Sequence, residues 1–319
     1  MAETTRTRIG TSELEIAPLA LGGNVFGWTA DRDASFDVLD GFLAGGGNFV
    51  DTADGYSHWV SGHGGGESET ILGEWFAARG TRDRVVLATK VSTHPQFSGL
   101  AGDNVRAAAD ASLARLGTDY IDLYYAHFDD AETPLEETVA AFSGLVDAGK
   151  IRAIGISNYT AERAAEWFRI ARAGGYHLPV ALQPHYNLVE RAFETNGLRA
   201  VAEAEGLGVF PYFSLASGFL AGKYRDAGDA ETPGASDRAS AAIAYLNDRG
   251  RAVLGALDTV AAAHAAELST IALAWLRQQP TVAAPIASAR TRDQLTALLA
   301  SLTTELTPAE LEQLAVASA

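Results

Sequence analysis

Short apolar runs recur along the chain, each bounded by turn residues and separated from the next by a helical pattern. Eight of them have the length and composition of buried strands: residues 18–21, 48–50, 85–89, 120–125, 153–156, 180–183, 208–212 and 282–286. A segment over residues 7–16, turning at Gly10-Thr11, predicts a β-hairpin ahead of them. Strands that alternate with helices indicate a parallel sheet.

The intervening segments have apolar residues at helical spacing. Two predicted helices show one apolar face each: Phe36, Leu39 and Leu43 on one, and Val105, Ala109, Leu113 and Leu116 on the other. Two helix starts resemble capping boxes with a proline at the first helical position: Thr133-Pro134-Leu135-Glu136 and Thr307-Pro308-Ala309-Glu310. Eight strand and helix alternations predict an α/β fold of the (β/α)8 TIM barrel type.

The alternative fold is an open, doubly wound sheet that binds a dinucleotide through a glycine-rich first turn. The first predicted strand leads into Gly22-Gly23-Asn24-Val25-Phe26-Gly27, whose spacing does not match G-x-G-x-x-G. Residues 215–251 are too irregular for a simple crossover and predict a long loop or lid after strand seven. We expect one barrel domain over residues 1–319.

Composition narrows the function classes. The chain has no cysteine, which excludes disulfides, thiolate metal ligands and thiol nucleophiles. Its 24 Lys and Arg against 40 Asp and Glu give a net charge of −16, which repels nucleic-acid phosphates and anionic lipid surfaces. No apolar run approaches the ~20 residues that span a bilayer, and the start MAETTRTRIG lacks the apolar segment of a secretory signal. We expect a soluble, cytoplasmic protein without nucleic-acid or membrane partners.

Four ionisable residues lie at or just beyond the ends of predicted strands. Asp51 follows the second strand, with Tyr56 five residues later, Lys90 follows the third, and His127 follows the fourth. Each alone could equally be a capped or solvated surface residue. The carboxyl ends of parallel barrel strands meet at one edge, so their joint placement predicts one site there.

These residue types suit protonation of an oxygen that gains negative charge. A tyrosine is a poor acid near neutrality, but a neighbouring ammonium such as that of Lys90 stabilises the phenolate. Asp51 would hold Lys90 in its charged form, and a neutral His127 would donate a hydrogen bond to a carbonyl oxygen. Such a site also needs a source of electrons.

At this point the chain resembles the aldo-keto reductase superfamily, the NAD(P)H-dependent barrel oxidoreductases, in its branch of bacterial reductases and potassium channel β subunits. The matching segments cover nearly the whole chain: Phe49-Val-Asp-Thr-Ala-Asp-Gly-Tyr56, Ala88-Thr-Lys90, Asp119-Tyr-Ile-Asp-Leu-Tyr-Tyr-Ala-His127, Gly149-Lys-Ile-Arg-Ala-Ile-Gly-Ile-Ser-Asn158, Gln183-Pro-His-Tyr-Asn187 and Gly218-Phe-Leu-Ala-Gly-Lys223. The resemblance implies that Tyr56 is the general acid, that Lys90 and Asp51 tune it, and that His127 polarises the substrate carbonyl.

The resemblance also implies an extended nicotinamide cofactor across the barrel mouth. The implied contacts near the nicotinamide are Gly23, Asn24, Asp51, Ser157, Asn158, Gln183 and Tyr212, with Tyr212 stacked on the ring. Ser157 and Asn158 alone could also be turn residues. The implied contacts toward the phosphate end are Leu215, Ser217, Gly218, Leu220, Gly222, Lys223, Ser288, Ala289, Arg290 and Gln294. His185 is expected to be a cofactor-side or structural residue.

A guanidinium at Arg290 suits a 2′-phosphate, which favours NADPH over NADH. One departure weakens this expectation, because relatives commonly carry Glu-Asn where this chain has Ala297 and Leu298. Arg290 could also be only a solvated residue at the start of the last barrel helix.

Aromatic residues after strands one, two and four predict the substrate wall. Trp28, Trp59 and Phe128 are expected to line a pocket around the carbonyl, beside Tyr56 and His127, and such walls suit sugars and aromatic aldehydes alike. In the glycine-rich segment 58–67, His58, His63 and Glu67 invite a metal interpretation, but the glycines give no rigid ligand set, so no metal is expected.

The leading hypothesis is an NADPH-dependent reductase of an aldehyde or ketone, sugar-like carbonyls included. The same residues could oxidise a sugar or alcohol hydroxyl with NADP or NAD, because microscopic reversibility leaves the direction open. A third hypothesis is a cofactor-sensing binding protein similar to potassium channel β subunits. The sequence does not decide the natural substrate or the oligomeric state.

Overall fold

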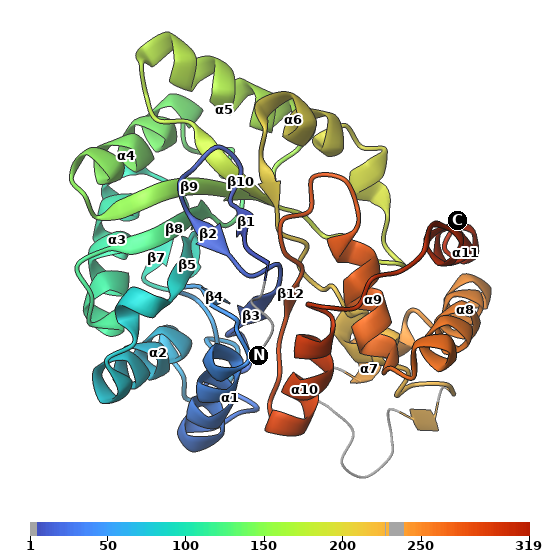
Figure 1. Ribbon diagram of the computed structural model, residues 1–319. Coiled ribbons are helices and arrows are strands. Elements are labelled where there is room, and N and C mark those ends of the chain that lie inside the picture. Colours follow the sequence, from blue (N-terminus) through green and yellow to red (C-terminus); the bar gives the residue numbers. More distant parts are fainter. Residues whose placement is uncertain (1–4, 227, 230–238) are drawn as a thin grey trace.

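The structure is a computed structural model that describes residues 5–226, 228–229 and 239–319. Eight parallel strands form one sheet in the order β11-β10-β9-β8-β5-β4-β3-β12, with helices packed around it (Figure 1). The strands in chain order are β3 (Ala20–Gly22), β4 (Phe49–Asp51), β5 (Val86–Val91), β8 (Ile121–Ala126), β9 (Ile151–Ser157), β10 (Pro179–Gln183), β11 (Gly208–Val209) and β12 (Ile286–Ala287). The predicted (β/α)8 barrel is confirmed.

The barrel closes through backbone hydrogen bonds between its two ends. Val209 N donates to Thr281 O, and Ala283 N donates back to Val209 O, both over 2.9 Å. The last two strands are shorter than predicted. In β11 and in β12, only two residues form regular ladder pairs with the neighbouring strand. Val282 pairs with Val209 only in an isolated bridge, so the prediction of a continuous strand over 282–286 is wrong.

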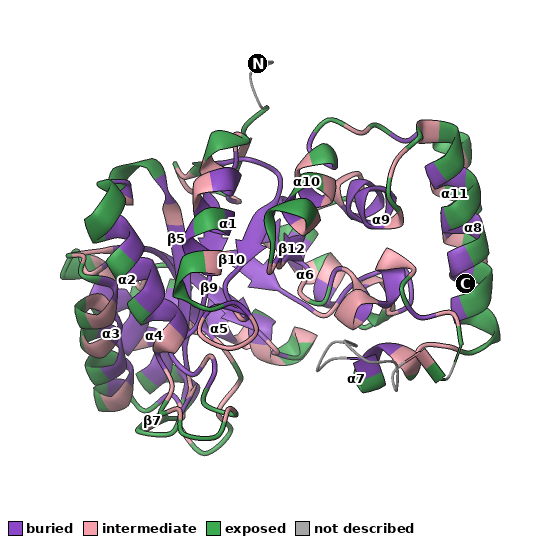
Figure 2. Ribbon diagram, turned by 90° about the horizontal axis from the view of Figure 1, so that it is seen from below, coloured by how far each residue is buried: buried purple, intermediate pink, exposed green. Residues whose placement is uncertain are grey.

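The helices follow the strands and cover the outside of the barrel, with their outer faces exposed (Figure 2). They are α1 (Arg32–Ala44), α2 (Glu67–Arg79), α3 (Gly102–Leu116), α4 (Leu135–Asp147), α5 (Ala161–Gly174), α6 (Leu198–Glu205), α7 (Ala239–Ile243), α8 (Asp248–His264), α9 (Leu268–Arg277), α10 (Arg292–Ala300) and α11 (Pro308–Ala317). The predicted apolar faces of α1 and α3 pack into the core between helices and strands. Apolar residues spaced at the 3.6-residue helical period lie on one face of a helix, and that face packs against the core.

The two predicted capping boxes differ in outcome. Thr307 and Glu310 form the reciprocal pair of hydrogen bonds at the start of α11, as predicted. At α4 the prediction is wrong, because the helix begins at Leu135 after an extended Pro134 and has no side-chain cap. The Thr133 hydroxyl donates to Asp130 instead, over 2.7 Å.

Two hairpins accompany the barrel. The predicted N-terminal hairpin is present as β1 (Thr7–Arg8) and β2 (Glu15–Ile16), and its Gly10 turns with a positive φ of 50°. Its Ile9 and Ile16 join the apolar cluster inside the barrel, so the hairpin covers the amino end of the strands. A second hairpin, β6 (Thr93–His94) and β7 (Phe97–Ser98), follows β5 and was not predicted.

The segment predicted to be an irregular loop after strand seven contains regular structure. It begins with a 3₁₀ segment over Ala216–Ala221, and its end lies in α7 and in the first turn of α8, so the long connection after strand seven includes short helices. Residue 227 and residues 230–238 of the predicted loop lie outside the described residues. Within the part of the chain that the structure describes, no single helix is long and apolar enough to cross a bilayer, and α8 with α9 passes that test only as a pair bent by 96°.

Candidate active site

The period of the strands places polar side chains inside the carboxyl end of the barrel. Phe49 and Ala88 belong to the apolar cluster inside the barrel, and two residues further along each strand come Asp51 and Lys90. Ala181 and Gln183 stand in the same relation on β10. Because strand side chains alternate between faces, all three polar groups point inward above the core.

Lys90 connects the predicted catalytic residues. Its buried ammonium donates to Asp51 Oδ1 over 2.5 Å, to Thr52 O over 2.7 Å and to the Tyr56 hydroxyl over 3.0 Å. Gln183 Nε2 donates to the other Asp51 oxygen over 3.0 Å. All three N–H groups of the ammonium are thus hydrogen-bonded, and one of them donates to the phenol oxygen.

The buried ion pair keeps Lys90 charged. Burial alone would lower the pKa of Lys90, but Asp51 and Tyr56 together raise it above its ordinary value. Burial pushes the pKa of Asp51 upward, against the opposing effects of Lys90 and Gln183. We take the charged pair as the neutral-pH state, because the short contact and the second donor at Asp51 stabilise the carboxylate.

His127 lies just beyond β8 and faces Tyr56. The two ring centres are 6.2 Å apart and the planes are nearly perpendicular, at 72°. Burial, and then the charge of Lys90, lower the pKa of His127 well below its ordinary value. The imidazole is therefore neutral at neutral pH, with Thr93 Oγ1 at 3.5 Å from its Nδ1.

The residues expected at the nicotinamide form a hydrogen-bonded chain beside His127. Asn158 Nδ2 donates to His127 O over 2.9 Å and to Ser157 Oγ over 3.1 Å, and Tyr212 OH donates to Asn158 Oδ1 over 2.8 Å. Ser157 Oγ donates to Gln183 O over 2.9 Å. His185 stacks on the Tyr212 ring with centres 5.2 Å apart, which fixes the plane of that ring.

The first and last barrel strands also meet here. Gly23 N donates to Asp51 O over 2.8 Å, and a side chain at Gly23 would come within 2.9 Å of the Ser68 hydroxyl. Ser288 Oγ donates to Asn24 Oδ1 over 2.6 Å. Gly23, Asn24 and Ser288 therefore lie together although the chain separates them.

The residues expected at the phosphate end occupy two loops. After β11 the chain turns through positive φ values of 58° at Ser217, 96° at Gly218 and 74° at Gly222. Leu215 is partly buried and Lys223 is exposed, whereas the Leu220 side chain is fully buried and offers only its backbone to a ligand. On the facing loop, Arg290 N donates to Gln294 Oε1 over 3.0 Å.

The departure from the family pattern after Gln294 has a structural counterpart. Leu298 packs into the core between helices and strands, and Ala297 O accepts the Thr270 hydroxyl over 2.8 Å. Leu298 thus serves packing, and neither position presents a polar side chain.

Aromatic rings surround Tyr56 and His127. Trp59 lies edge-on to Tyr56 with centres 6.1 Å apart and edge-on to Trp28 at 5.5 Å. The ring centres of Phe128 and His127 are 4.8 Å apart. Trp59 is 47 % exposed and Phe128 46 % exposed, which is unusual for large apolar side chains and typical of a binding surface.

The glycine-rich segment 58–67 is organised by local contacts. Glu67 Oε1 accepts the backbone N–H groups of Gly64 and Gly65, and His58 Nδ1 lies 2.7 Å from Gly55 O. Among the residues that the structure describes, no group of three or more His, Asp or Glu could hold a metal ion.

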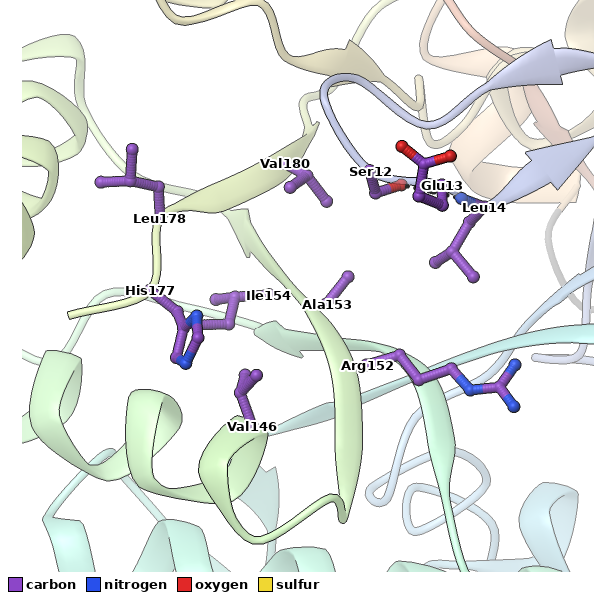
Figure 3. A pocket seen from close by; sticks show the side chains of 10 residues that line it. All are labelled: Ser12, Glu13, Leu14, Val146, Arg152, Ala153, Ile154, His177, Leu178 and Val180. Atoms are coloured by element: carbon purple, nitrogen blue, oxygen red, sulfur yellow. Dashed lines mark hydrogen bonds between the residues drawn. The ribbon is translucent and has the colours of Figure 1, made fainter.

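A cavity lies at the opposite end of the barrel. About 480 Å³ opens between the N-terminal hairpin and the amino ends of β9 and β10, lined by Leu14, Arg152, Ile154 and Val180 among others (Figure 3). It contains none of the residues discussed above. Functional sites of such barrels lie at the carboxyl ends of the strands, so the candidate site is the polar cluster around Lys90.

Comparison with known proteins agrees with this geometry. The sequence model of the Aldo/keto reductase family matches residues 18–318. The chain belongs to this family. It is 33% identical over 318 residues to norsolorinic acid reductase stcV of Emericella nidulans, covering 94% of this chain and 78% of that protein. It is 32% identical over 325 residues to protein tas of Escherichia coli, covering 94% and 93% of the two chains. It is 33% identical over 298 residues to the uncharacterized oxidoreductase YrpG of Bacillus subtilis, covering 91% and 88%. An aldo/keto reductase with such relatives is an oxidoreductase.

Sequence reasoning did not single out two residues beside this site. Phe213 is 46 % exposed next to Tyr212, and Asp54 is fully buried two residues before Tyr56. The sequence contained a signal for Asp54, because a carboxylate between a buried strand and a predicted catalytic residue is costly to bury without a partner.

Proposed function

We propose that the protein is an NADPH-dependent oxidoreductase that reduces an aldehyde or ketone to the alcohol, with Tyr56 as the general acid. The observation that carries the proposal is the 3.0 Å contact between the Tyr56 hydroxyl and a buried ammonium held by Asp51. A buried ammonium next to a phenol makes the phenol more acidic, which is what a general acid requires.

In the proposed reaction Tyr56 gives its proton to the substrate oxygen. The Lys90 ammonium stabilises the negative charge that remains on the phenol oxygen, and Asp51 keeps the ammonium in place. Neutral His127 donates a hydrogen bond from Nε2 to the carbonyl oxygen while its Nδ1 faces Thr93, which polarises the bond and orients the substrate.

The chain offers a donor set that fits a nicotinamide. A carboxamide both donates and accepts hydrogen bonds, and so do the Ser157 hydroxyl and the Asn158 and Gln183 amides beside His127. Tyr212, held in plane by His185, presents a ring for stacking. The reduced cofactor would supply the hydride that the carbonyl carbon gains.

NADPH is the proposed nucleotide because Arg290 and Lys223 lie on the loops expected at its 2′-phosphate. Lys223 is exposed, and a guanidinium at Arg290 suits paired hydrogen bonds to a phosphate. NADH is the less favoured choice. The missing polar side chains at positions 297 and 298 are expected to weaken adenine contacts for either nucleotide.

The proposed substrate is a small carbonyl compound held between Trp28, Trp59 and Phe128. Reduction is the proposed direction, since the relative from Emericella nidulans is named as a reductase of norsolorinic acid. We also propose that residues 1–319 act as one domain in the cytoplasm, with no nucleic-acid or membrane partner.

The test is Tyr56→Phe, which removes the proton and leaves the ring. We expect carbonyl reduction to fall by at least about a thousandfold while NADPH still binds, measured by quenching of tryptophan fluorescence. Tyr176→Phe is the matched control, because Tyr176 packs against Gly174 after α5, away from the site. Steady-state rates with both cofactor redox states over aldoses and aldehydes decide the direction. A Tyr56→Phe enzyme with the wild-type rate for its best carbonyl substrate contradicts the proposal.

A further inference from the structure

Asp54 is a buried carboxyl group in the turn that carries Tyr56. Its backbone N–H donates to Lys90 O over 3.1 Å, and Tyr56 N donates to Ala53 O over 3.3 Å to close the turn. The turn is tightly packed, because a side chain at Gly55 would meet Thr93 Oγ1 at 2.5 Å. The Asp54 side chain is fully buried, and neither carboxyl oxygen is hydrogen-bonded to a side chain among the described residues.

A second buried polar cluster lies around Asp54, behind the strands that carry Lys90 and His127. Glu69 on α2 accepts from Thr89 over 2.6 Å and from Arg115 on α3 over 2.7 Å. Thr89 is paired in register with Tyr124 on β8, whose buried hydroxyl also lacks a hydrogen-bond partner within the described part of the chain. Thr89 precedes Lys90, so this cluster and the catalytic residues occupy opposite faces of the same strand.

The cluster has one positive charge for two carboxyl groups. Glu69 has the guanidinium of Arg115, which leaves Asp54 without a counter-ion of its own. Burial, and then the charge of Glu69, raise the pKa of Asp54 to about 8, although Arg115, the backbone N–H of Gly55 and Lys90 oppose this. Burial, and then the charge of Asp54, raise the pKa of Tyr124, so this phenol stays neutral. Burial, and then the charge of Arg115, lower the pKa of His94, so this imidazole gives Asp54 no positive partner.

We propose that Asp54 is a positioning residue that acts as a neutral carboxylic acid, so that the ammonium of Lys90 acts on Tyr56 without a second opposing carboxylate. This inference rests on the proposed function of Tyr56. An ionised Asp54 would add a second negative charge to the field at Lys90, across the strand from Asp51. The field of the ammonium at the phenol oxygen would then be weaker, and Tyr56 would release its proton less readily.

The direct test is the pH at which Tyr56 ionises. Tyrosine labelled with an isotope in the ring gives an NMR titration for each ring, and Tyr56→Phe assigns the signal. Asp54→Asn removes the negative charge that Asp54 gains above about pH 8, so we expect Tyr56 in this variant to ionise about one pH unit lower. Asp40→Asn on α1 is the matched control and should leave the signal of Tyr56 unchanged. Equal midpoints in the wild type and Asp54→Asn overturn the proposal.

A second variant covers the case in which Asp54→Asn folds poorly. Glu69→Gln removes the charge that disfavours ionised Asp54, so the infrared band of the protonated carboxyl group should disappear at a lower pH than in the wild type. A wild-type protein without this band at neutral pH refutes the proposal. The shift of the band in Glu69→Gln assigns it to Asp54, whose pKa the charge of Glu69 raises.

Activity separates this inference from the proposed function. Above about pH 8, where Asp54 of the wild type is ionised, kcat/KM for carbonyl reduction should be up to about tenfold higher in Asp54→Asn than in the wild type, and equal within about threefold at lower pH. If no variant reduces any carbonyl compound but the Tyr56 midpoint still shifts, the proposed function fails and the assignment of Asp54 stands. If reduction proceeds with identical pH profiles, the function stands and the assignment fails.

Discussion

Replacing Asp54 by asparagine should make the fold more stable, by an amount that grows with pH. The pKa of Asp54 is raised from its ordinary 3.8 to about 8 in the folded protein. Between these values the folded state holds a proton that the unfolded state has released. The contribution of the group to stability is therefore fully present below the unfolded pKa and is lost as pH rises through the folded pKa.

The magnitude follows from the linkage relation. One proton of difference changes the free energy of unfolding by about 1.4 kcal/mol for each pH unit. The two pKa values are roughly four units apart, so the wild type loses up to about 6 kcal/mol relative to its protonated form. Asparagine does not titrate. The difference in unfolding free energy, variant minus wild type, should rise steadily from about pH 5 to about pH 7.5 and become constant above about pH 8.

The assay is urea unfolding of both proteins at several pH values in this window, followed by tryptophan fluorescence. Asp40→Asn provides the control. Burial raises the pKa of Asp40, but hydrogen bonds from Arg79 and Trp75 outweigh it, so the pKa is lowered. The contribution of Asp40 to the stability of the fold is therefore complete above the unfolded pKa and is lost only in acid. Its stability difference from the wild type should be constant across the window. A pH-independent difference for Asp54→Asn as well would refute the reasoning about the buried carboxyl group.

Three further predictions concern other parts of the chain. Lys90→Met should reduce carbonyl reduction at least about a hundredfold with NADPH affinity retained, as measured by steady-state rates and fluorescence titration, and an active variant would show that the ammonium does not assist Tyr56. Trp59→Ala should raise KM for aromatic aldehydes up to about tenfold with little change for short aliphatic ones, and an equal effect on both would remove Trp59 from the substrate wall. Thr307→Ala should lower the urea-unfolding free energy by about 1 kcal/mol through loss of the α11 capping box, whereas unchanged stability would mean that the box contributes nothing.

Much of the fold could be predicted because local rules and global packing agree. The alternation of apolar runs with amphipathic helices is a property of the sequence, and it indicates the barrel and the strand ends at which Asp51, Lys90 and His127 lie. The capping box at Thr307 was predictable for the same reason. The one at Thr133 failed because Asp130 competes for the threonine hydroxyl, and that competitor is supplied by the loop geometry.

The ends of the barrel were harder to predict. The strands before and after the closure have only two residues each in regular ladders, since closure joins residues far apart in the chain through a few backbone hydrogen bonds. Apolar composition alone does not reveal where such pairing stops. The irregular composition of residues 215–251 likewise concealed short helices that tertiary contacts support.

The sequence by itself determined the order of strands and helices, the identity of the ionisable residues at their ends and the family to which the chain belongs. Only the tertiary structure decided that Lys90 reaches Asp51 and Tyr56 together, and that Glu69 behind it pairs with Arg115 while Asp54 is left without a counter-ion of its own. Residue types and spacing are local properties of the chain. Burial, and the charges that meet inside the protein, arise only when strands and helices distant in sequence pack against one another.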